Sequence, residues 1–177
     1  MSKVATTTDE QICCPDFSSR IEKFDETEIT WNNKAFIKES TWCFFYLPLN
    51  FGGATTRACQ KMEAADAKVP LDDENFVMLA DMTSRWNTNV LFPVTKDVVP
   101  NAEMVHLSGT FRTKVFEGPY SQFGEWIKEM KAYVKKEQKE EDVDLDDCTR
   151  WYCYYATCPK CAKKYGKNYT VLFVKMD

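Results

Sequence analysis

The sequence predicts a single α+β domain, made of a duplicated strand–helix–strand–strand repeat and preceded by an N-terminal extension. Two segments carry this prediction, because each begins with a strand-like run, turns at a glycine and continues into an amphipathic helix. Each helix is followed by two further strand-like runs. The helices also share a register, since an offset of 65 residues places Gly53 on Gly118 and Met62 on Ile127. Identity between the halves is almost nil, so the prediction depends on element order and register.

The bulk properties of the chain limit the kinds of protein it can be. With 177 residues it is long enough for one domain with a core. The net charge of −4 argues against nucleic acid and anionic membranes as partners. The longest apolar run, Trp42–Leu47, is far shorter than the about 20 residues of a membrane helix, and the N-terminus lacks the apolar run of a signal peptide. We therefore expect a soluble, cytoplasmic protein that is a monomer or a homodimer.

The N-terminal part, residues 1–40, is expected to form an arm and a short hairpin. The first 27 residues are polar and weakly patterned, which is typical of a partly ordered arm. The hairpin is expected over residues 28–40 with its turn at Asn32-Asn33, because asparagine tolerates the positive φ of a tight turn. The small-molecule-binding domain is then expected over residues 41–177.

The first repeat begins with a strand over Thr41–Leu49, which is dense in aromatic and aliphatic residues. Gly52-Gly53 ends this strand. The helix is expected over Ala54–Val69, and Pro70 stops it. Strands over Asn75–Asp81 and Asn89–Thr95 complete the repeat. The apolar face of the helix consists of Ala58, Met62, Ala65 and Val69.

The second repeat begins with a long strand over Met104–Phe116. Gly118-Pro119 turns the chain, and proline suits the first turn of a helix because its missing N–H has no partner there. The charged run over residues 135–147 is expected to be a solvated loop. Strands over Arg150–Thr157 and Asn168–Met176 follow it. The apolar helix face consists of Phe123, Ile127, Met130 and Val134.

Several motifs together make the chain similar to a known family. It resembles the GyrI-like effector-binding (small-molecule-binding) domains over roughly residues 40–177. More closely, it looks like a bacterial-type subgroup that has a C-terminal CPxC motif and is commonly labelled "hydrolase". The motifs are Cys13-Cys14-Pro15, Trp31 to Lys34, Arg57-Ala58-Cys59, Leu107 to Phe111, Lys114 to Tyr120, and Cys158 to Tyr169.

The resemblance implies an antiparallel sheet with two helices on one face and an aromatic groove between the repeats. In the wider family this groove binds amphipathic, often cationic or polycyclic small molecules. Some members hydrolyse strained cyclopropane-containing genotoxins with a groove carboxylate on the last strand, in a Glu-Leu-Tyr-like triplet. The matching stretch here is Val171-Leu172-Phe173, so the resemblance does not carry the family's glutamate over to this chain.

Five aromatic residues are candidates for ligand binding. Aromatic faces attract flat or cationic ligands, at about 0.5–2 kcal/mol per good contact. Aromatic residues at helical spacing are also common in cores, so both roles stay open. Tyr120 is the strongest candidate because it lies at the helix entrance where the halves meet. The five candidates are Tyr46, Trp86, Phe111, Tyr120 and Trp126.

Two residues, Glu117 and His106, are considered for acid–base chemistry. Glu117 precedes the turn and is the candidate catalytic carboxylate, because a buried acid with a raised pKa activates water. The alternative is a surface glutamate near a helix N-terminus. His106 is the only histidine, lies in a strand pattern and accompanies no Gly-x-Ser-x-Gly motif, which favours a structural role.

The eight cysteines include one close pair, Cys158-Pro-Lys-Cys161. Two thiolates at this spacing chelate tetrahedral zinc, and Cys13 and Cys14 are candidates for further ligands if the arm folds back. A CxxC motif that opens a short helix also resembles the thioredoxin active site, which predicts redox chemistry. The third alternative is a set of structural thiols. Zinc is therefore the one candidate cofactor.

The sequence thus predicts a protein that binds an amphipathic or aromatic small molecule in a groove between the repeats. Hydrolysis of this molecule, as in detoxification, stays open. The competing prediction is a cysteine-dependent protein that uses Cys158 and Cys161 for zinc binding or thiol redox chemistry.

Overall fold

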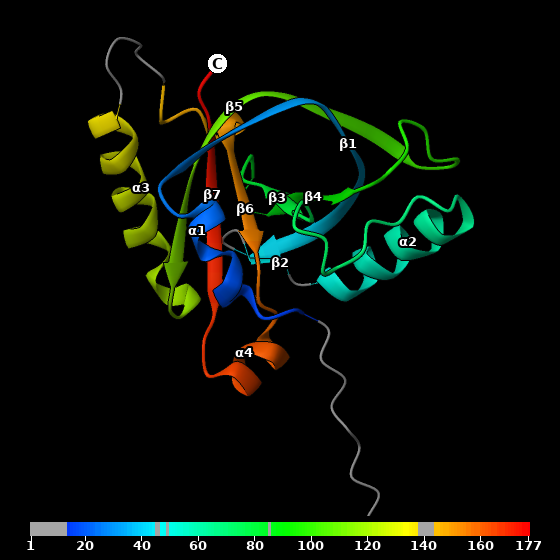
Figure 1. The fold of residues 1–177 in the computed structure, drawn as a ribbon, viewed down its shortest axis with the longest axis horizontal. Helices are drawn as coiled ribbons and strands as arrows, with labels where there is room; N and C mark the ends of the chain where they lie inside the picture. The colour runs from blue at the N-terminus through cyan, green and yellow to red at the C-terminus, as the bar shows by residue number, and fades with distance from the viewer. Residues whose placement is uncertain (1–13, 45–46, 49, 85, 138–143) are drawn as a thin grey trace, which may run out of the picture.

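The computed structural model describes residues 14–44, 47–48, 50–84, 86–137 and 144–177. Its strands form one antiparallel sheet in the order β1-β4-β3-β6-β7-β5, and β5 also pairs with β1. The sheet therefore closes into a six-stranded barrel (Figure 1). The barrel strands are β1 (Thr27–Phe44), β3 (Leu79–Asp81), β4 (Asn87–Pro93), β5 (Glu103–Glu117), β6 (Trp151–Tyr155) and β7 (Tyr169–Lys175).

The expected mixture of helices and antiparallel strands is confirmed. The short strand β2 (Leu47–Pro48) pairs with the end of β1. The order of the main strands and of the two long helices matches the expected repeat, while the duplication itself stays a prediction. The helices are α1 (Ile21–Phe24), α2 (Phe51–Ala64), α3 (Phe123–Glu137) and α4 (Pro159–Tyr165), with 3-10 turns η1 (Phe17–Arg20), η2 (Tyr120–Gln122) and η3 (Cys148–Arg150).

The hairpin expected over residues 28–40 is wrong, because β1 is one continuous strand. Asn33 has a positive φ of 56°, as the sequence suggested, but the register with β5 shifts between Trp31 and Lys34 and pairing continues on both sides. The backbone N–H of Asn33 donates to Ser108 Oγ at 2.8 Å. One positive φ therefore makes a β-bulge here, whereas a two-residue type I′ turn needs two.

The length of β1 closes the barrel. Residues 27–38 pair with β5, and residues 36–42 pair with β4, so Phe36 has a partner on each side. Closure removes the exposed edges that an open sheet would have. The expected domain boundary at residue 40 consequently lies inside a strand.

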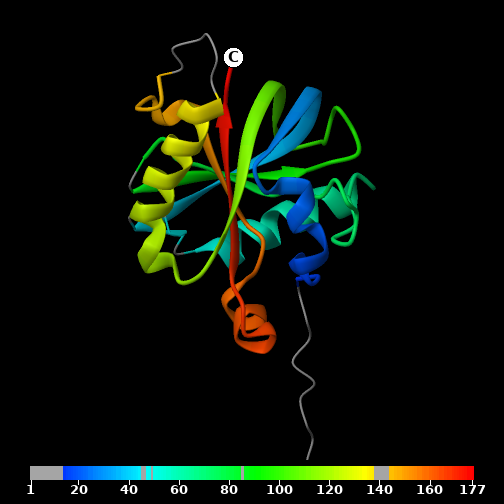
Figure 2. The same cartoon turned by 60° about the vertical axis from the view of Figure 1, so that its left-hand side comes forward.

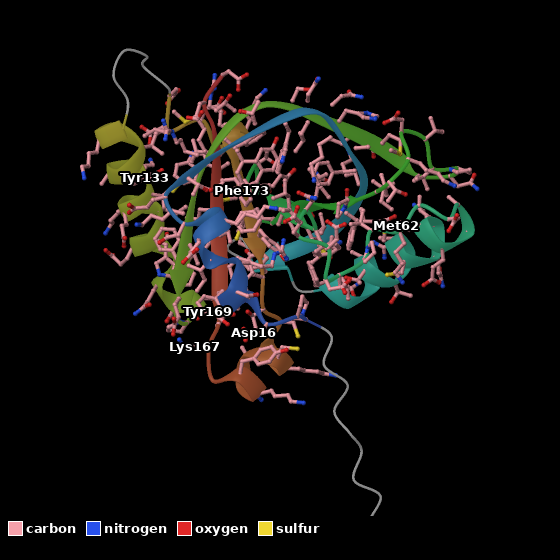
Figure 3. All side chains as sticks on the ribbon, in the orientation of Figure 1. Asp16, Met62, Tyr133, Lys167, Tyr169 and Phe173 are labelled. Atoms are coloured by element: carbon pink, nitrogen blue, oxygen red, sulfur yellow. The ribbon has the colours of Figure 1, made fainter. Side chains whose placement is uncertain are left out.

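The barrel interior holds one apolar cluster. Alternate residues of the strands point inward, including Phe36, Phe111 and Phe173; Figure 3 labels Phe173 on β7. The chain before β1 also belongs to this cluster, since Phe17 and Phe24 are only 2% and 1% exposed. Residues 14–26 are therefore folded against the barrel, in contrast to the arm expected over residues 1 to about 27.

Both long helices lie on the outer surface of the barrel, against different walls (Figure 2). The helix α2 packs Ala58 and Met62 on the outward side chains of β1 and β4. The helix α3 packs Trp126 and Met130 on those of β5, β6 and β7. These helix faces follow the 3.6-residue periodicity of the sequence. Among the described residues, no helix combines the length and apolarity that crossing a membrane requires.

The helix α2 ends at Ala64, before the end expected at Val69. The backbone turns at Asp66, whose φ is 49°. Lys68 then forms an isolated bridge with Val94 beside β4. The bridge to Val94, just after the end of β4, therefore replaces the last turn of the expected helix and leaves the following loop beside α2.

Candidate active site

An apolar cavity of about 510 Å³ lies beside α2, within the size range of small-molecule sites. Its walls come from α2, the loop after it, the end of β4 and the residues that join β6 to α4. Four α2 residues share one helix face, because they are spaced by four, four and three positions. They are Phe51, Thr55, Cys59 and Met62.

Tyr120 forms part of the cavity wall and is held from two sides. Its hydroxyl donates to Thr157 O at 3.2 Å, or to Asn168 Oδ1 at the same distance. Asn168 in turn donates to Gly118 O at 2.8 Å, which ties the turn to the connection between β6 and β7. Burial raises the pKa of Tyr120 to about 12, so its phenol is neutral at neutral pH.

Three cysteines meet where α4 begins. The Sγ atoms of Cys14, Cys158 and Cys161 all lie within 4.8 Å of one another. Cys158 is the N-cap of α4, and its Sγ accepts from Cys161 N at 3.5 Å. Cys158 N donates to Cys14 Sγ at 3.4 Å, and Tyr165 Oη donates to Cys14 O at 2.8 Å. These bonds hold the segment before η1 against α4.

This thiol cluster, Cys14, Cys158 and Cys161, has the chemistry of a soft-metal site. Zinc–thiolate bonds of about 2.3 Å in a tetrahedron place the ligand sulfurs about 3.8 Å apart. The observed limit of 4.8 Å is close enough for small side-chain rotations to complete the set. Cys161 is buried, while Cys14 and Cys158 also line the cavity. A metal held here would therefore lie at the cavity wall.

A comparison with known protein families assigns the chain to a broad class of protein. A family model described as bacterial hydrolase matches residues 4–176. The chain belongs to this bacterial hydrolase family. A search of the curated proteins finds no match. The match includes the thiol cluster and the cavity, whereas the finer GyrI-like assignment stays a prediction.

The structure of this family member brings together only some of the site residues that were predicted from the sequence. Tyr120 lines the cavity, and Cys14 lies with the Cys158–Cys161 pair. Tyr46 and Cys13 lie outside the described residues. Only the local CxxC spacing and the turn before α3 were strong signals in the sequence.

The other predicted site residues lie elsewhere in the fold. Phe111 is buried in the barrel interior, with its ring centroid 4.7 Å from that of Trp31. Trp126 is buried between α3 and the outer wall, and Trp86 is exposed. Glu117 is half exposed, with Oε2 3.4 Å from Lys167 Nζ. Their roles in binding or catalysis stay predictions, and none of these four residues lines the cavity.

Sequence reasoning missed several cavity residues. Phe92 and Pro93 come from the end of β4, and Lys68, Phe76 and Met78 come from the loop between α2 and β3. Helical spacing could have indicated Cys59, because it lies four residues after Thr55 and three residues before Met62, on one side of the helix. The loop residues follow no regular period, so no comparable signal exists for them.

Proposed function

We propose that this member of the bacterial hydrolase family hydrolyses an amphipathic small molecule that binds in the cavity beside α2. The thiol cluster would hold a zinc ion through Cys14, Cys158 and Cys161. One observation carries the proposal: Cys14 and Cys158 belong both to the cluster and to the cavity wall. The bound molecule and the metal ligands therefore share one space.

The thiol cluster offers the best-supported route to an activated nucleophile. When bound, zinc supplies a water of lowered pKa and polarises a carbonyl oxygen. A cysteine nucleophile paired with histidine would need His106, the only histidine. This residue lies on β5 with Nε2 4.0 Å from Asp97 Oδ1, and it does not line the cavity. A thiol–imidazole pair is therefore not formed at this site.

The cavity walls supply binding and water exclusion. The hydroxyl of Thr55 donates to Phe51 O at 2.9 Å, so this wall presents mainly carbon and sulfur to a ligand. Burial of an apolar ligand surface is worth roughly 25 cal/mol per Å², which favours a molecule with a substantial apolar body. The hydrogen bond that the Tyr120 hydroxyl donates to Thr157 O or to Asn168 Oδ1 keeps its ring in place at the wall.

Zinc analysis tests the metal part of the proposal. Purified protein is expected to contain near-stoichiometric zinc, and Cys158→Ser is expected to lose most of it because one thiolate ligand is removed. Cys148→Ser is the matched control, because Cys148 is exposed and its Sγ lies 3.9 Å from Thr83 O, outside the cluster. Equal zinc contents in all three proteins would contradict the proposed ligand set.

Ester hydrolysis tests the catalytic part. Nitrophenyl esters of increasing acyl length are suitable probes, because the apolar cavity is expected to favour the longer chains. Activity is expected to fall on treatment with EDTA and to return when zinc is added. Unchanged hydrolysis by the metal-free protein would refute the metal-dependent route.

A thiol redox function is the second candidate. The backbone N–H of Cys161 donates to Cys158 Sγ, an arrangement that stabilises a thiolate at position 158. Reduction of insulin disulfides by metal-free protein, and its loss in Cys158→Ser, would support this function. Near-stoichiometric zinc in reduced protein together with no insulin reduction would exclude it.

A further inference from the structure

The geometry points to a ligand with an anionic head group, such as a carboxylate, that pairs with Lys68 at the end of the cavity away from the thiol cluster. This inference rests on the proposed binding of an amphipathic molecule beside α2. It adds the sign of the ligand's charge and the direction in which the ligand lies. It also makes Lys68 a residue that determines specificity.

The charge of the cavity wall is the first argument. Among the described residues that line the cavity, Lys68 is the one Lys or Arg, and none is Asp or Glu. A cationic ligand, which the GyrI-like resemblance implied, would meet a like charge at Lys68, and the carboxylate of Glu63, which pairs with Lys68, does not line the cavity. The position that matches the family's groove carboxylate is Val171, which is buried in the barrel interior. The wall therefore favours an anion over a cation.

The shape of the cavity is the second argument. Its α2 wall extends from Phe51 to Met62, which is about 16 Å along a helix axis. Lys68 follows the C-terminal end of this helix, four residues after Ala64. Helix α4, which begins after Cys158, lies nearer the first turn of α2 than its last turn in both Figure 1 and Figure 2. The Lys68 ammonium group and the thiol cluster thus lie at opposite ends of the apolar cavity.

The availability of Lys68 is the third argument. Its Nζ lies 2.9 Å from Glu63 Oε1, and the two side chains are 49% and 62% exposed. The hydrogen bond to Glu63 raises the pKa of Lys68, so the ammonium is charged at neutral pH. Exposed ion pairs of this kind contribute little stability, so a ligand carboxylate can replace Glu63 at low cost. Glu63 itself does not line the cavity.

Three probes with the same apolar chain test the inference by calorimetry: dodecanoate, dodecanol and dodecylamine. The full chain is expected to bind dodecanoate about five-fold more tightly than dodecanol, which corresponds to one partly exposed ion pair. Dodecylamine is expected to bind most weakly. The preference for dodecanoate should shrink as the salt concentration rises, because salt screens exposed charges.

Substitutions at Lys68 then assign the preference to this residue. Lys68→Met is expected to bind dodecanoate and dodecanol equally, Lys68→Arg to keep the preference, and Lys68→Glu to prefer dodecylamine. Lys128→Met is the control, because Lys128 is an exposed α3 residue paired with Glu125 and does not line the cavity. It should behave as the unchanged protein does.

The outcomes separate this inference from the proposed function. Equal binding of the three probes by the unchanged protein would overturn the anionic head group and leave small-molecule binding in place. A preference that persists in Lys68→Met would overturn the role of Lys68. Failure of all three probes to bind would overturn both the inference and the proposed cavity.

Discussion

Glu39 offers a sharp test of how α2, one wall of the cavity, is held on the barrel. This β1 carboxylate is only 6% exposed and accepts from two α2 side chains. Arg57 Nε donates to Oε2 at 2.8 Å, and Lys61 Nζ donates to Oε1 at 2.7 Å. Glu39→Gln keeps the side-chain volume and removes the charge, so it isolates the electrostatic part of the attachment.

The expected loss follows from these two contacts. A buried hydrogen bond to a charged group contributes about 1.5–3 kcal/mol, and partial exposure of both partners lowers that figure. Glutamine retains one acceptor but faces two cations with an amide NH₂. We therefore expect Glu39→Gln to lower the free energy of unfolding by about 1–2 kcal/mol at neutral pH.

The pH dependence gives the test a second readout. Burial acts to raise the pKa of Glu39, but hydrogen bonds from Lys61 and Arg57 outweigh it and the net pKa is lowered. The group therefore contributes its full stability above the unfolded pKa, near 4.3, and loses it as the pH falls through the lower folded pKa. The difference between Glu39→Gln and the unchanged protein should shrink in acid.

Urea unfolding at neutral pH and at several acidic pH values measures both effects. Glu125→Gln is the matched control, because Glu125 pairs with Lys128 on the exposed side of α3 and should change stability by less than about 0.5 kcal/mol. Equal stability of Glu39→Gln and the unchanged protein at neutral pH would refute the reasoning. A loss that stays constant down to strongly acidic pH would refute the electrostatic explanation of it.

Three further perturbations test the helices and the cavity. Gly52→Ala is expected to stabilise the protein by about 0.5 kcal/mol in thermal unfolding, because an added Cβ meets nothing within 4 Å and alanine favours helix; a loss would contradict it. Cys59→Phe is expected to fill the cavity and abolish dodecanoate binding, whereas Gln60→Phe, on the exposed side of α2, should leave it; binding by both variants would place the ligand elsewhere. Trp126→Ala is expected to lower the free energy of unfolding by about 3–5 kcal/mol, because Trp126 is buried between α3 and the barrel wall. Trp86→Ala is expected to lower it by less than about 0.5 kcal/mol, because Trp86 is 58% exposed, and similar losses in the two variants would contradict this difference.

Local patterns predicted the parts of the fold that depend on local physics. The apolar faces of α2 and α3 were predictable because helical periodicity places Met62 and Met130 on the buried side. Barrel closure was not, because it depends on pairing between strands about 75 residues apart, such as Trp31 with Gly109. The positive φ at Asn33 was predictable from the sequence. Whether it forms a tight turn or a β-bulge depends on whether β5 pairs with β1 both before and after Asn33.

The same contrast applies to the site. The spacing of Cys158 and Cys161 is a local signal, and the return of Cys14 depends on apolar contacts of Phe17 that no local pattern indicates. Aromatic residues in strands do not by themselves locate the cavity, because a strand alternates between faces and sequence alone does not say which face is inside. Phe111 points into the barrel while Phe116 packs beneath α3 on the outside.

The packing of the barrel explains why the cavity lies outside it. Val171 pairs in register with Val115 and Tyr154, and its side chain joins an interior filled by aromatic rings. A carboxylate at this position would lose hydration among these rings. The space beside α2 has the opposite character, since it is open, apolar and bordered by thiols and one lysine. If the protein hydrolyses a small molecule as proposed, the reaction therefore takes place in the cavity beside α2 and not at the last barrel strand, β7.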